Sequence, residues 1–286
     1  MSILITGATG QVGGHIVDEL LAARVPVRAS SRNPATARVA PGVELVAGDL
    51  NEPETMGAAL RGVKSVFLYA QNKKLPELMA AMRSAGVEQV VVLSTIDATS
   101  EQAYSRYNRD LHRGVEDAVA GAGFRCTMLR PGAFASNTRR FWAADIKAAG
   151  CVYLPYPETQ QAPVDERDIA AVAVRALLSR SLDGTTPVLT GPKSLTQRQM
   201  VATISAALGR PIPVITVPLE EARKLLATRT GAAYVEILLA RWADEVGIPP
   251  VVTDEVARAT GRPARPYAEW VAHNLAAFDT LPRNTA

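Results

Sequence analysis

Three glycines near the start of the sequence have a spacing that suits the binding of phosphate groups. The segment from Thr6 to Gly13 reads T-G-A-T-G-Q-V-G and lies between a short apolar run and an amphipathic one. In such a turn Gly7 permits the sharp change of direction, Gly10 lets the backbone approach a pyrophosphate, and Gly13 lets a helix pack closely on a strand. Amides at the start of the helix then point at the phosphates. The segment predicts a dinucleotide-binding turn; the alternative is a glycine-rich turn with no ligand.

The residues that follow the second apolar run indicate which dinucleotide such a turn would accept. An NAD-binding protein usually places an acidic residue about 20 positions beyond the glycines, where it holds the ribose 2′-hydroxyl. Here no Asp or Glu occurs between Glu19 and Glu44, and the run ends at Arg32, with Arg28 four positions earlier on the same face. A guanidinium forms charge-assisted hydrogen bonds with a 2′-phosphate. The pattern favours NADP(H) over NAD(H); the alternative is that both arginines are solvated.

The elements that must position these residues alternate in type along the first half of the chain. Runs rich in β-branched residues predict strands at 2–6, 26–31, 43–48, 63–70, 89–94 and 125–130. Helical periodicity lies between them, at 11–23, 53–61, 75–85 and 104–120; in the first, Val12, Ile16 and Leu20 form one apolar stripe. Strand–helix alternation builds right-handed crossovers and a parallel sheet that is covered on both faces. The predicted fold class is α/β, a doubly wound Rossmann-type domain.

After Pro131 the alternation stops and the sequence becomes mainly helical. Helices are predicted at 136–149, 165–178, 195–208, 220–245 and 267–278, a loop at 151–163, and one more strand at 187–190. We therefore predict a dinucleotide-binding domain over 1–150 and a smaller, mainly helical substrate lobe over 151–286, with the strand near 186–190 rejoining the sheet. A ligand-binding cleft is expected between the two.

The composition excludes several other classes of protein. Hydrophobic residues make up 48% and charged residues 21% of the 286 residues, which is typical of a folded globular chain. The net charge of +3 is spread along the chain and gives no nucleic-acid footprint, and no apolar run is long enough for a membrane helix. Cys126 and Cys151 form no metal-binding pair and the three histidines lie far apart, so no metal site is expected. With no signal peptide evident, we expect a cytoplasmic protein with two reduced thiols.

Several short motifs occur together in the order found in one known group of proteins. T-G-A-T-G-x-V-G at the start, R-N-P from Arg32, G-D-L at 48–50 and L-R-P-G at 129–132 are followed by V-D-x-x-D-I-A from Val164, L-T-G at 189–191 and Y-A-E-W from Tyr267. Over nearly its whole length the chain resembles the atypical short-chain dehydrogenase/reductase superfamily, and within it the NmrA-like proteins. Known members include NADPH-dependent quinone and dye reductases, and redox-sensing regulators that bind the dinucleotide without turning it over.

The resemblance implies roles for residues in the glycine turn and at the ends of the predicted strands. The cofactor would contact Gly7, Thr9, Gly10, Gln11 and Val12 at its pyrophosphate, Arg32 at its 2′-phosphate, Asp49 and Leu50 at its adenine, Tyr69, Ala70 and Gln71 along its channel, and Ser94, Thr95, Pro131 and Gly132 near its nicotinamide. Phe134 and Asn137 would lie near the substrate. Phe141 and Trp142 are candidate pocket walls, or else core of the second lobe.

The sequence departs from the wider superfamily at the catalytic dyad. That superfamily carries Tyr-x-x-x-Lys, in which the ammonium lowers the pKa of the Tyr so that it can protonate a carbonyl. Glu116 suggests a register that places His112 at the Lys position and Asn108 at the Tyr position. Asn108 has no titratable proton, while Tyr104 lies one helical turn earlier and Tyr107 one residue off. His112, Tyr104, Tyr107 and Ser94 remain as candidate catalytic residues, each with an ordinary structural role as its alternative.

Three functions fit these observations. The first is an NADPH-dependent oxidoreductase that transfers hydride to a small aromatic or quinone-like acceptor, because such an acceptor needs no strong protein acid. The second is a non-catalytic NADP(H)-binding redox sensor with a protein partner, and the third is a biosynthetic isomerase or cyclase on the same fold. The expected partner of the first is a small molecule; the sequence names neither the substrate nor the oligomeric state.

Overall fold

Seven strands form one parallel sheet in the computed structural model, which describes residues 2–70 and 73–279. The strands follow the order β3-β2-β1-β4-β5-β6-β9, which confirms the doubly wound fold class. They are β1 (Ile3–Ile5), β2 (Val27–Ser31), β3 (Glu44–Ala47), β4 (Ser65–Tyr69), β5 (Gln89–Leu93), β6 (Arg125–Pro131) and β9 (Val188–Leu189). The order reverses between β1 and β4, and ligands of such sheets bind at the carboxyl ends of the strands beside this reversal.

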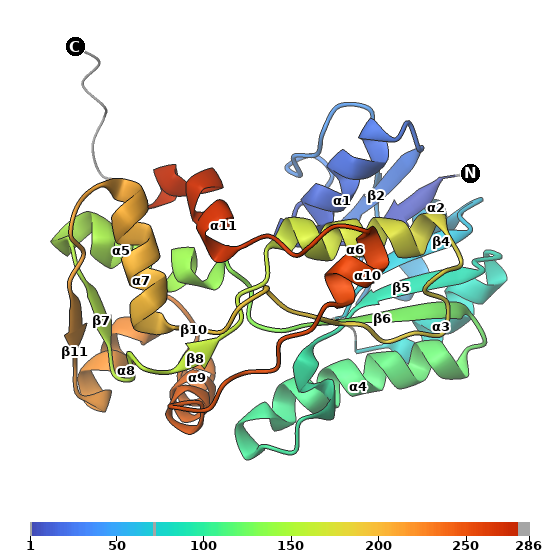
Figure 1. The fold of residues 1–286 in the computed structure, drawn as a ribbon. Helices are drawn as coiled ribbons and strands as arrows, with labels where there is room; N and C mark the ends of the chain where they lie inside the picture. The colour runs from blue at the N-terminus through green and yellow to red at the C-terminus, as the bar shows by residue number, and fades with distance from the viewer. Residues whose placement is uncertain (1, 71–72, 280–286) are drawn as a thin grey trace, which may run out of the picture.

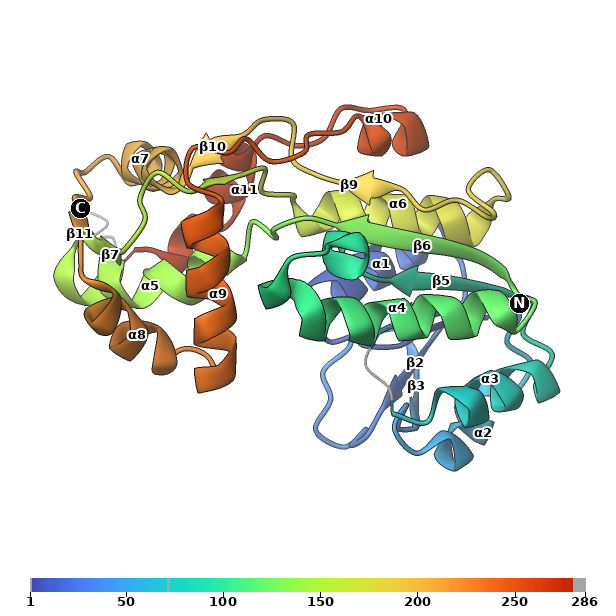
Figure 2. The same ribbon diagram turned by 90° about the horizontal axis from the view of Figure 1, so that it is seen from below.

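Helices cover both faces of the sheet. On one face lie α1 (Gln11–Ala22) and α6 (Glu166–Leu178), which share a core with β1; the predicted stripe of Val12, Ile16 and Leu20 is buried there. On the other lie α2 (Gly57–Leu60), α3 (Leu75–Ser84) and α4 (Arg106–Gly121), with α4 and α6 on opposite sides of β6 (Figure 2). Each face needs an apolar helix stripe because strands of a parallel sheet are hydrophobic on both sides.

A second, mainly helical lobe packs around its own core (Figure 1). It contains α5 (Asn137–Ala149), α7 (Gln197–Leu208), α8 (Leu219–Ala227), α9 (Ala232–Asp244), α11 (Tyr267–His273) and the parallel pair β7 (Val152–Leu154) and β11 (Val214–Thr216). Two short strands, β8 (Gln160–Gln161) and β10 (Leu195–Thr196), pair in antiparallel fashion beside it. No helix among the described residues has the length and apolarity needed to cross a bilayer.

The two cores are interleaved along the chain and do not divide at residue 150. Phe141 and Ile146 of α5 belong to the second core, although they precede that position. Conversely, three elements that follow residue 150 belong with the sheet: β9 is one of its strands, and α6 and α10 (Glu255–Thr260) pack against it. Val256 of α10 lies in the core that α1 shares with β1. The chain therefore passes between the lobes several times, and these crossings lie close to the strand ends that carry the candidate site.

Several predicted elements differ from the observed ones. The segment 151–163, expected to be a loop, contains β7 and β8; β7 pairs with a remote three-residue strand that leaves no periodic signal. The helix expected at 53–61 is a 3₁₀ turn, Pro53–Met56, followed by α2, and that at 220–245 is two helices, with Gly231 capping the second. The first two residues of the helix expected at 195–208 form the strand β10. The helix expected at 267–278 ends at His273 and is followed by a 3₁₀ turn, Leu275–Ala277. Helix α10 was missed because six residues are too few for a periodic pattern.

Candidate cofactor and substrate site

The glycine turn joins β1 to α1 and leaves an exposed edge of backbone. Gly7 has a φ of 65°, in the left-handed region, and its carbonyl accepts a hydrogen bond of 2.9 Å from the amide of Gly10. A Cβ on Gly13 would lie 2.2 Å from the Gly7 carbonyl oxygen, so only glycine fits where helix and turn touch. Gly7, Thr9, Gly10 and Gln11 are exposed, whereas Val12 is core and could offer a ligand only its amide.

The first turn of α1 carries no side-chain cap and no acidic residue. Its leading amides are therefore free to donate to an external acceptor, and the helix dipole favours a negative charge there. Gln11 is the first residue of α1. Its Oε1 accepts a hydrogen bond from the hydroxyl of Ser136, just before α5, which fixes the position of the Gln11 side chain. An uncapped helix start beside a glycine cradle is what a dinucleotide pyrophosphate requires, so the residues fit that cofactor.

The two arginines of β2 have different surroundings. Arg28 is largely buried: its Nε donates to Glu44 on β3 (2.8 Å), and its Nη1 donates to the carbonyls of Ala59 (3.1 Å) and Arg61 (2.6 Å). Its guanidinium therefore ties β2 to β3 and α2, which corrects its expected role beside a phosphate. Arg32 follows β2 directly, is exposed, and makes no ion pair or hydrogen bond with the described part of the chain. Of these two arginines, only Arg32 has a guanidinium without a partner among the described residues.

The other expected cofactor contacts lie at the carboxyl ends of neighbouring strands. Asp49 follows β3 and its Oδ1 accepts from the amide of Asn51 (2.9 Å), which fixes a turn that includes Leu50. Tyr69 ends β4, packs over Gly7 and is 43% exposed, while Ala70 is buried; Gln71 lies outside the described residues. Ser94 and Thr95 follow β5, and Pro131 and Gly132 lie at the end of β6. The parallel sheet thus gathers these positions along one edge.

A cavity of about 320 Å³ opens beside this edge, between the strand ends and the second lobe. All three expected substrate residues, Phe134, Asn137 and Trp142, line it, as do Tyr69, Thr95 and Gly132. Its apolar wall is built from aromatic rings of both lobes: Tyr69, Phe134, Phe141, Trp142, Tyr234 and Trp242. Phe141 and Trp242 meet edge to face, with centroids 5.9 Å apart. Flat, apolar molecules suit such a wall.

The polar side of the cavity is organised by an ion pair that joins the two lobes. Asp97 lies in the 3₁₀ turn Ile96–Thr99 after β5. Its carboxylate accepts hydrogen bonds from the guanidinium of Arg241 on α9 (2.5 Å) and from the side-chain amide of Asn108 on α4 (3.2 Å). All three residues line the cavity. Asn108 therefore lies where it faces the ligand space. It holds Asp97 there and offers no titratable proton.

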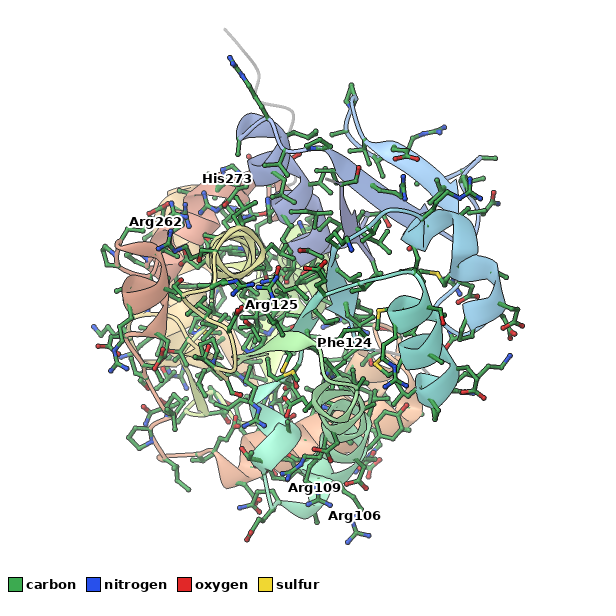
Figure 3. All side chains as sticks on the ribbon, turned by 90° about the vertical axis from the view of Figure 1, so that its right-hand side faces the viewer. Arg106, Arg109, Phe124, Arg125, Arg262 and His273 are labelled. Atoms are coloured by element: carbon green, nitrogen blue, oxygen red, sulfur yellow. The ribbon has the colours of Figure 1, made fainter. Side chains whose placement is uncertain are left out.

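The candidate catalytic side chains on and before α4 do not line this cavity. His112 is mostly buried, and burial lowers its pKa more than Asp97 and Glu116 raise it, so the imidazole is neutral at pH 7. Tyr104 packs under the guanidinium of Arg241, 5.4 Å from the ring centroid, and its pKa is raised mainly by burial. Tyr107 is 69% exposed, in a shallow surface hollow near Arg106. Arg106 and Arg109 mark this outer end of α4 in Figure 3.

Ser94 belongs to a buried group beneath the strand ends. Glu116 accepts two hydrogen bonds from Arg130 of β6, at 2.9 and 2.5 Å, and so anchors α4 to the sheet. Burial alone would raise the pKa of Glu116, but the hydrogen bonds from Arg130 lower it. Ser94 is buried and does not line the cavity. Within 2–70 and 73–279, no three His, Cys, Asp or Glu side chains lie close enough to hold a metal ion.

Glu245, four positions after Arg241, is expected to give the protein a measurable pH dependence. Burial, only partly offset by Arg241, raises its pKa to about 7. Between about pH 4.5 and 7 the folded chain then holds a proton that the unfolded chain has lost, so this group lowers stability as the pH rises through that window. Relative to Glu245→Gln, wild type should lose about 2 kcal/mol of unfolding free energy over the window. Urea denaturation at several pH values measures this, and parallel curves for the two proteins would contradict it.

Several residues of the cavity were missed by sequence reasoning. Asp97 lies in the turn that follows β5, whereas Arg140, Gln197, Tyr234 and Arg241 come from helices of the second lobe. Arg241 and Asp97 are 144 positions apart, and the ordinary helical pattern around Arg241 carries no signal of its partner. Only a contact between the lobes brings these residues to the nucleotide edge.

The sheet order, the glycine turn and the cavity together define a dinucleotide-binding protein of the atypical short-chain dehydrogenase/reductase class. Comparison with known proteins agrees: residues 1–250 match the model of the NmrA-like family. The chain therefore belongs to the NmrA-like family.

Two relatives and one solved structure are similar over nearly the whole chain. A (4-alkanoyl-5-oxo-2,5-dihydrofuran-3-yl)methyl phosphate reductase of Streptomyces griseus is 36% identical over 281 residues, covering 96% of this chain and 99% of its own. An NAD(P)H azoreductase of Xenophilus azovorans is 35% identical, with the same two coverages, 96% and 99%. The crystal structure of an NADPH-dependent quinone oxidoreductase of Escherichia coli is 25% identical, covers 95% of this chain and 99% of its own, and superposes with a TM-score of 0.80.

Proposed function

We propose that this chain is an NADPH-dependent reductase of small, conjugated acceptors such as quinones or azo compounds. The observation that carries the proposal is the cavity: aromatic rings from both lobes wall a space that begins at the strand ends beside the glycine turn. The relatives that are 36% and 35% identical over nearly the whole chain are reductases, and on that ground the chain is an NAD(P)H-dependent oxidoreductase. The phosphorylated form of the cofactor and the class of acceptor are the parts proposed here.

The residues present would hold the cofactor as follows. The amides of Gln11 and Val12 would receive the pyrophosphate beside Gly10, Arg32 would receive the 2′-phosphate, and Asp49 and Leu50 the adenine. Tyr69, Thr95 and Gly132 would border its nicotinamide end, since all three line the cavity. When bound, the reduced cofactor supplies a hydride. The chain's part is to orient the acceptor against the aromatic wall.

The type of acceptor follows from the absence of a proton donor at the expected position. Asn108 faces the cavity with an amide, and neutral His112 lies outside its lining. Reduction of a simple ketone creates an alkoxide that needs a proton at once, whereas hydride addition to a quinone gives a delocalised anion that water can protonate. The relatives named above support this choice, because they act on a furanone phosphate, azo compounds and quinones respectively.

The direct test is to follow NADPH oxidation with a panel of quinones, azo dyes and aldehydes while measuring cofactor binding in parallel. We expect turnover with conjugated acceptors and little with saturated aldehydes. The assay is carried out in a reducing buffer, because the described chain has two free cysteines. Tight binding of NADPH without turnover of any acceptor would instead support a redox sensor. Conversion of an acceptor without net oxidation of the cofactor would support an isomerase.

Variants of the α4 side chains are expected to have small effects on turnover. His112→Ala, Tyr104→Phe and Tyr107→Phe should each lower kcat by less than the ~10²–10⁴-fold typical of a general acid or base, because none lines the cavity. Steady-state kinetics with the best quinone measures this. A loss of about four orders of magnitude in either Tyr→Phe variant would identify a proton donor and favour a carbonyl reductase.

A further inference from the structure

We propose that the acceptor of this enzyme is an anion, and that Arg140 of α5 recognises its negative group. This inference rests on the proposed reductase function and names its substrate class. It begins with the charges of the cavity. Asp97, Arg140 and Arg241 are its only charged lining residues within the described chain, and Asp97 is paired with Arg241. The remaining cation, Arg140, makes no ion pair with any described residue, so the cavity lining carries one uncompensated positive charge.

The guanidinium of Arg140 is held at the aromatic wall. Its Cζ lies 5.9 Å from the ring centroid of Phe141 and 5.8 Å from that of Tyr234 on α9, and both rings line the cavity. Contacts with two ring faces restrict the side chain while its N–H groups stay free to donate. The residue is exposed and also lines the cavity, which places it at the rim. A flat ring in the cavity would thus bring its acidic substituent to the guanidinium.

One unpartnered donor in the wall supports a ligand that carries acceptor oxygens, and one unpartnered acceptor, Oε1 of Gln197, is available to a donor of the same ligand. The indole N–H of Trp142 is buried and has no hydrogen-bond acceptor among the described residues, although Trp142 lines the cavity. A buried donor without an acceptor is costly, and an oxygen of a bound ligand would satisfy it. The combination of a free cation, a free donor and aromatic rings recognises a conjugated ring system that bears a sulfonate, carboxylate or phosphate.

The neighbouring arginine provides a matched control. Arg139 is also exposed and unpaired among the described residues, but it lines a different hollow of about 300 Å³, which includes Gly10 and Gln11 of the glycine turn and His273 of α11. Any effect of Arg139 on the cofactor is common to both acceptors and cancels in the ratio of their kcat/KM values. Figure 3 labels His273 in that region, close to α1. Arg139 and Arg140 therefore share residue type, helix and exposure and differ in the cavity that they face.

The test compares a naphthoquinone sulfonate with the corresponding sulfonamide, which has the same size and no charge. Wild type should reduce the sulfonate with the higher kcat/KM. In Arg140→Gln the ratio of the two kcat/KM values should fall about five- to thirtyfold, the range between an exposed ion pair and a hydrogen bond to a charged group. Arg140→Lys should keep part of the preference, Arg139→Gln should leave the ratio unchanged, and added salt should reduce it in wild type. A wild type without preference, or an Arg140→Gln variant that retains it, overturns the proposal.

A binding measurement separates this inference from the reductase proposal. Naphthalenesulfonate and naphthalenesulfonamide are titrated by calorimetry into wild type and Arg140→Gln, each saturated with oxidised cofactor. If neither quinone is reduced, the reductase proposal fails, and calorimetry still decides the role of Arg140. Tighter binding of the sulfonate that is lost in Arg140→Gln supports it; equal binding of both compounds by wild type excludes it.

Discussion

Gly10→Val is expected to abolish dinucleotide binding in a protein that remains folded. The new Cβ would lie 3.1 Å from the Gly7 carbonyl oxygen, a tight contact that the turn relieves with a shift of a few tenths of an ångström. The γ-methyl groups would then occupy the exposed edge where a pyrophosphate meets the first amides of α1. Loss of these charge-assisted hydrogen bonds weakens binding at least about a hundredfold. Calorimetric titration with NADPH measures the affinity, and circular dichroism with thermal unfolding reports the fold.

The choice of position is important for this experiment. Gly13→Ala would place a Cβ 2.2 Å from the same carbonyl oxygen, so it would distort the turn itself and confound binding with folding. Gly114→Val is the matched control, because a Cβ there, in the middle of α4, has no heavy atom within 4 Å. Gly114→Val should bind NADPH as wild type does. Normal affinity in a folded Gly10→Val variant would exclude the turn as the phosphate site.

Arg32→Ala is expected to remove the preference for NADPH over NADH. The wild-type protein should bind NADPH about ten- to a hundredfold more tightly, because the Arg32 guanidinium would meet the 2′-phosphate and no Asp or Glu lies between Glu19 and Glu44 to hold a 2′-hydroxyl. The variant should bind both cofactors with similar affinity, close to that of wild type for NADH. Titration of both cofactors against both proteins gives the ratio directly.

Arg28→Ala serves as the contrasting variant. Its guanidinium is committed to Glu44 and to backbone carbonyls of α2 and the residue after it, so its loss should reduce stability by about 1–3 kcal/mol. The ratio of NADPH to NADH affinity should remain that of wild type. If Arg28→Ala changes the ratio and Arg32→Ala does not, the phosphate contact has been assigned to the wrong end of β2.

The local features of this protein could be predicted from its sequence because short segments determine them. The alternation of β-branched runs and apolar stripes such as Val12, Ile16 and Leu20 defines a parallel sheet with covered faces, and the sheet order confirms it. The glycine spacing of the turn depends on sterics within seven residues, and the space around Gly13 shows the contact that excludes every other side chain. The strand β7 could not be predicted, because it lies outside the strand–helix alternation that marks β1 and is stabilised by a partner strand, β11, about 60 residues further along the chain.

The sequence by itself determined the Rossmann-type sheet, the glycine turn and the strand ends at which a ligand would lie. Only the tertiary structure decided what each polar side chain does there. Strand periodicity places Arg28 and Arg32 on one face. The groups that bind the Arg28 guanidinium, the Glu44 carboxylate and a carbonyl next to α2, come from other elements, and they leave Arg32 unpaired. In the same way, Asp97 cancels the charge of Arg241 and leaves that of Arg140 free. The charge of a site depends on which groups are paired, and pairing between residues 144 positions apart is set by the packing of the two lobes.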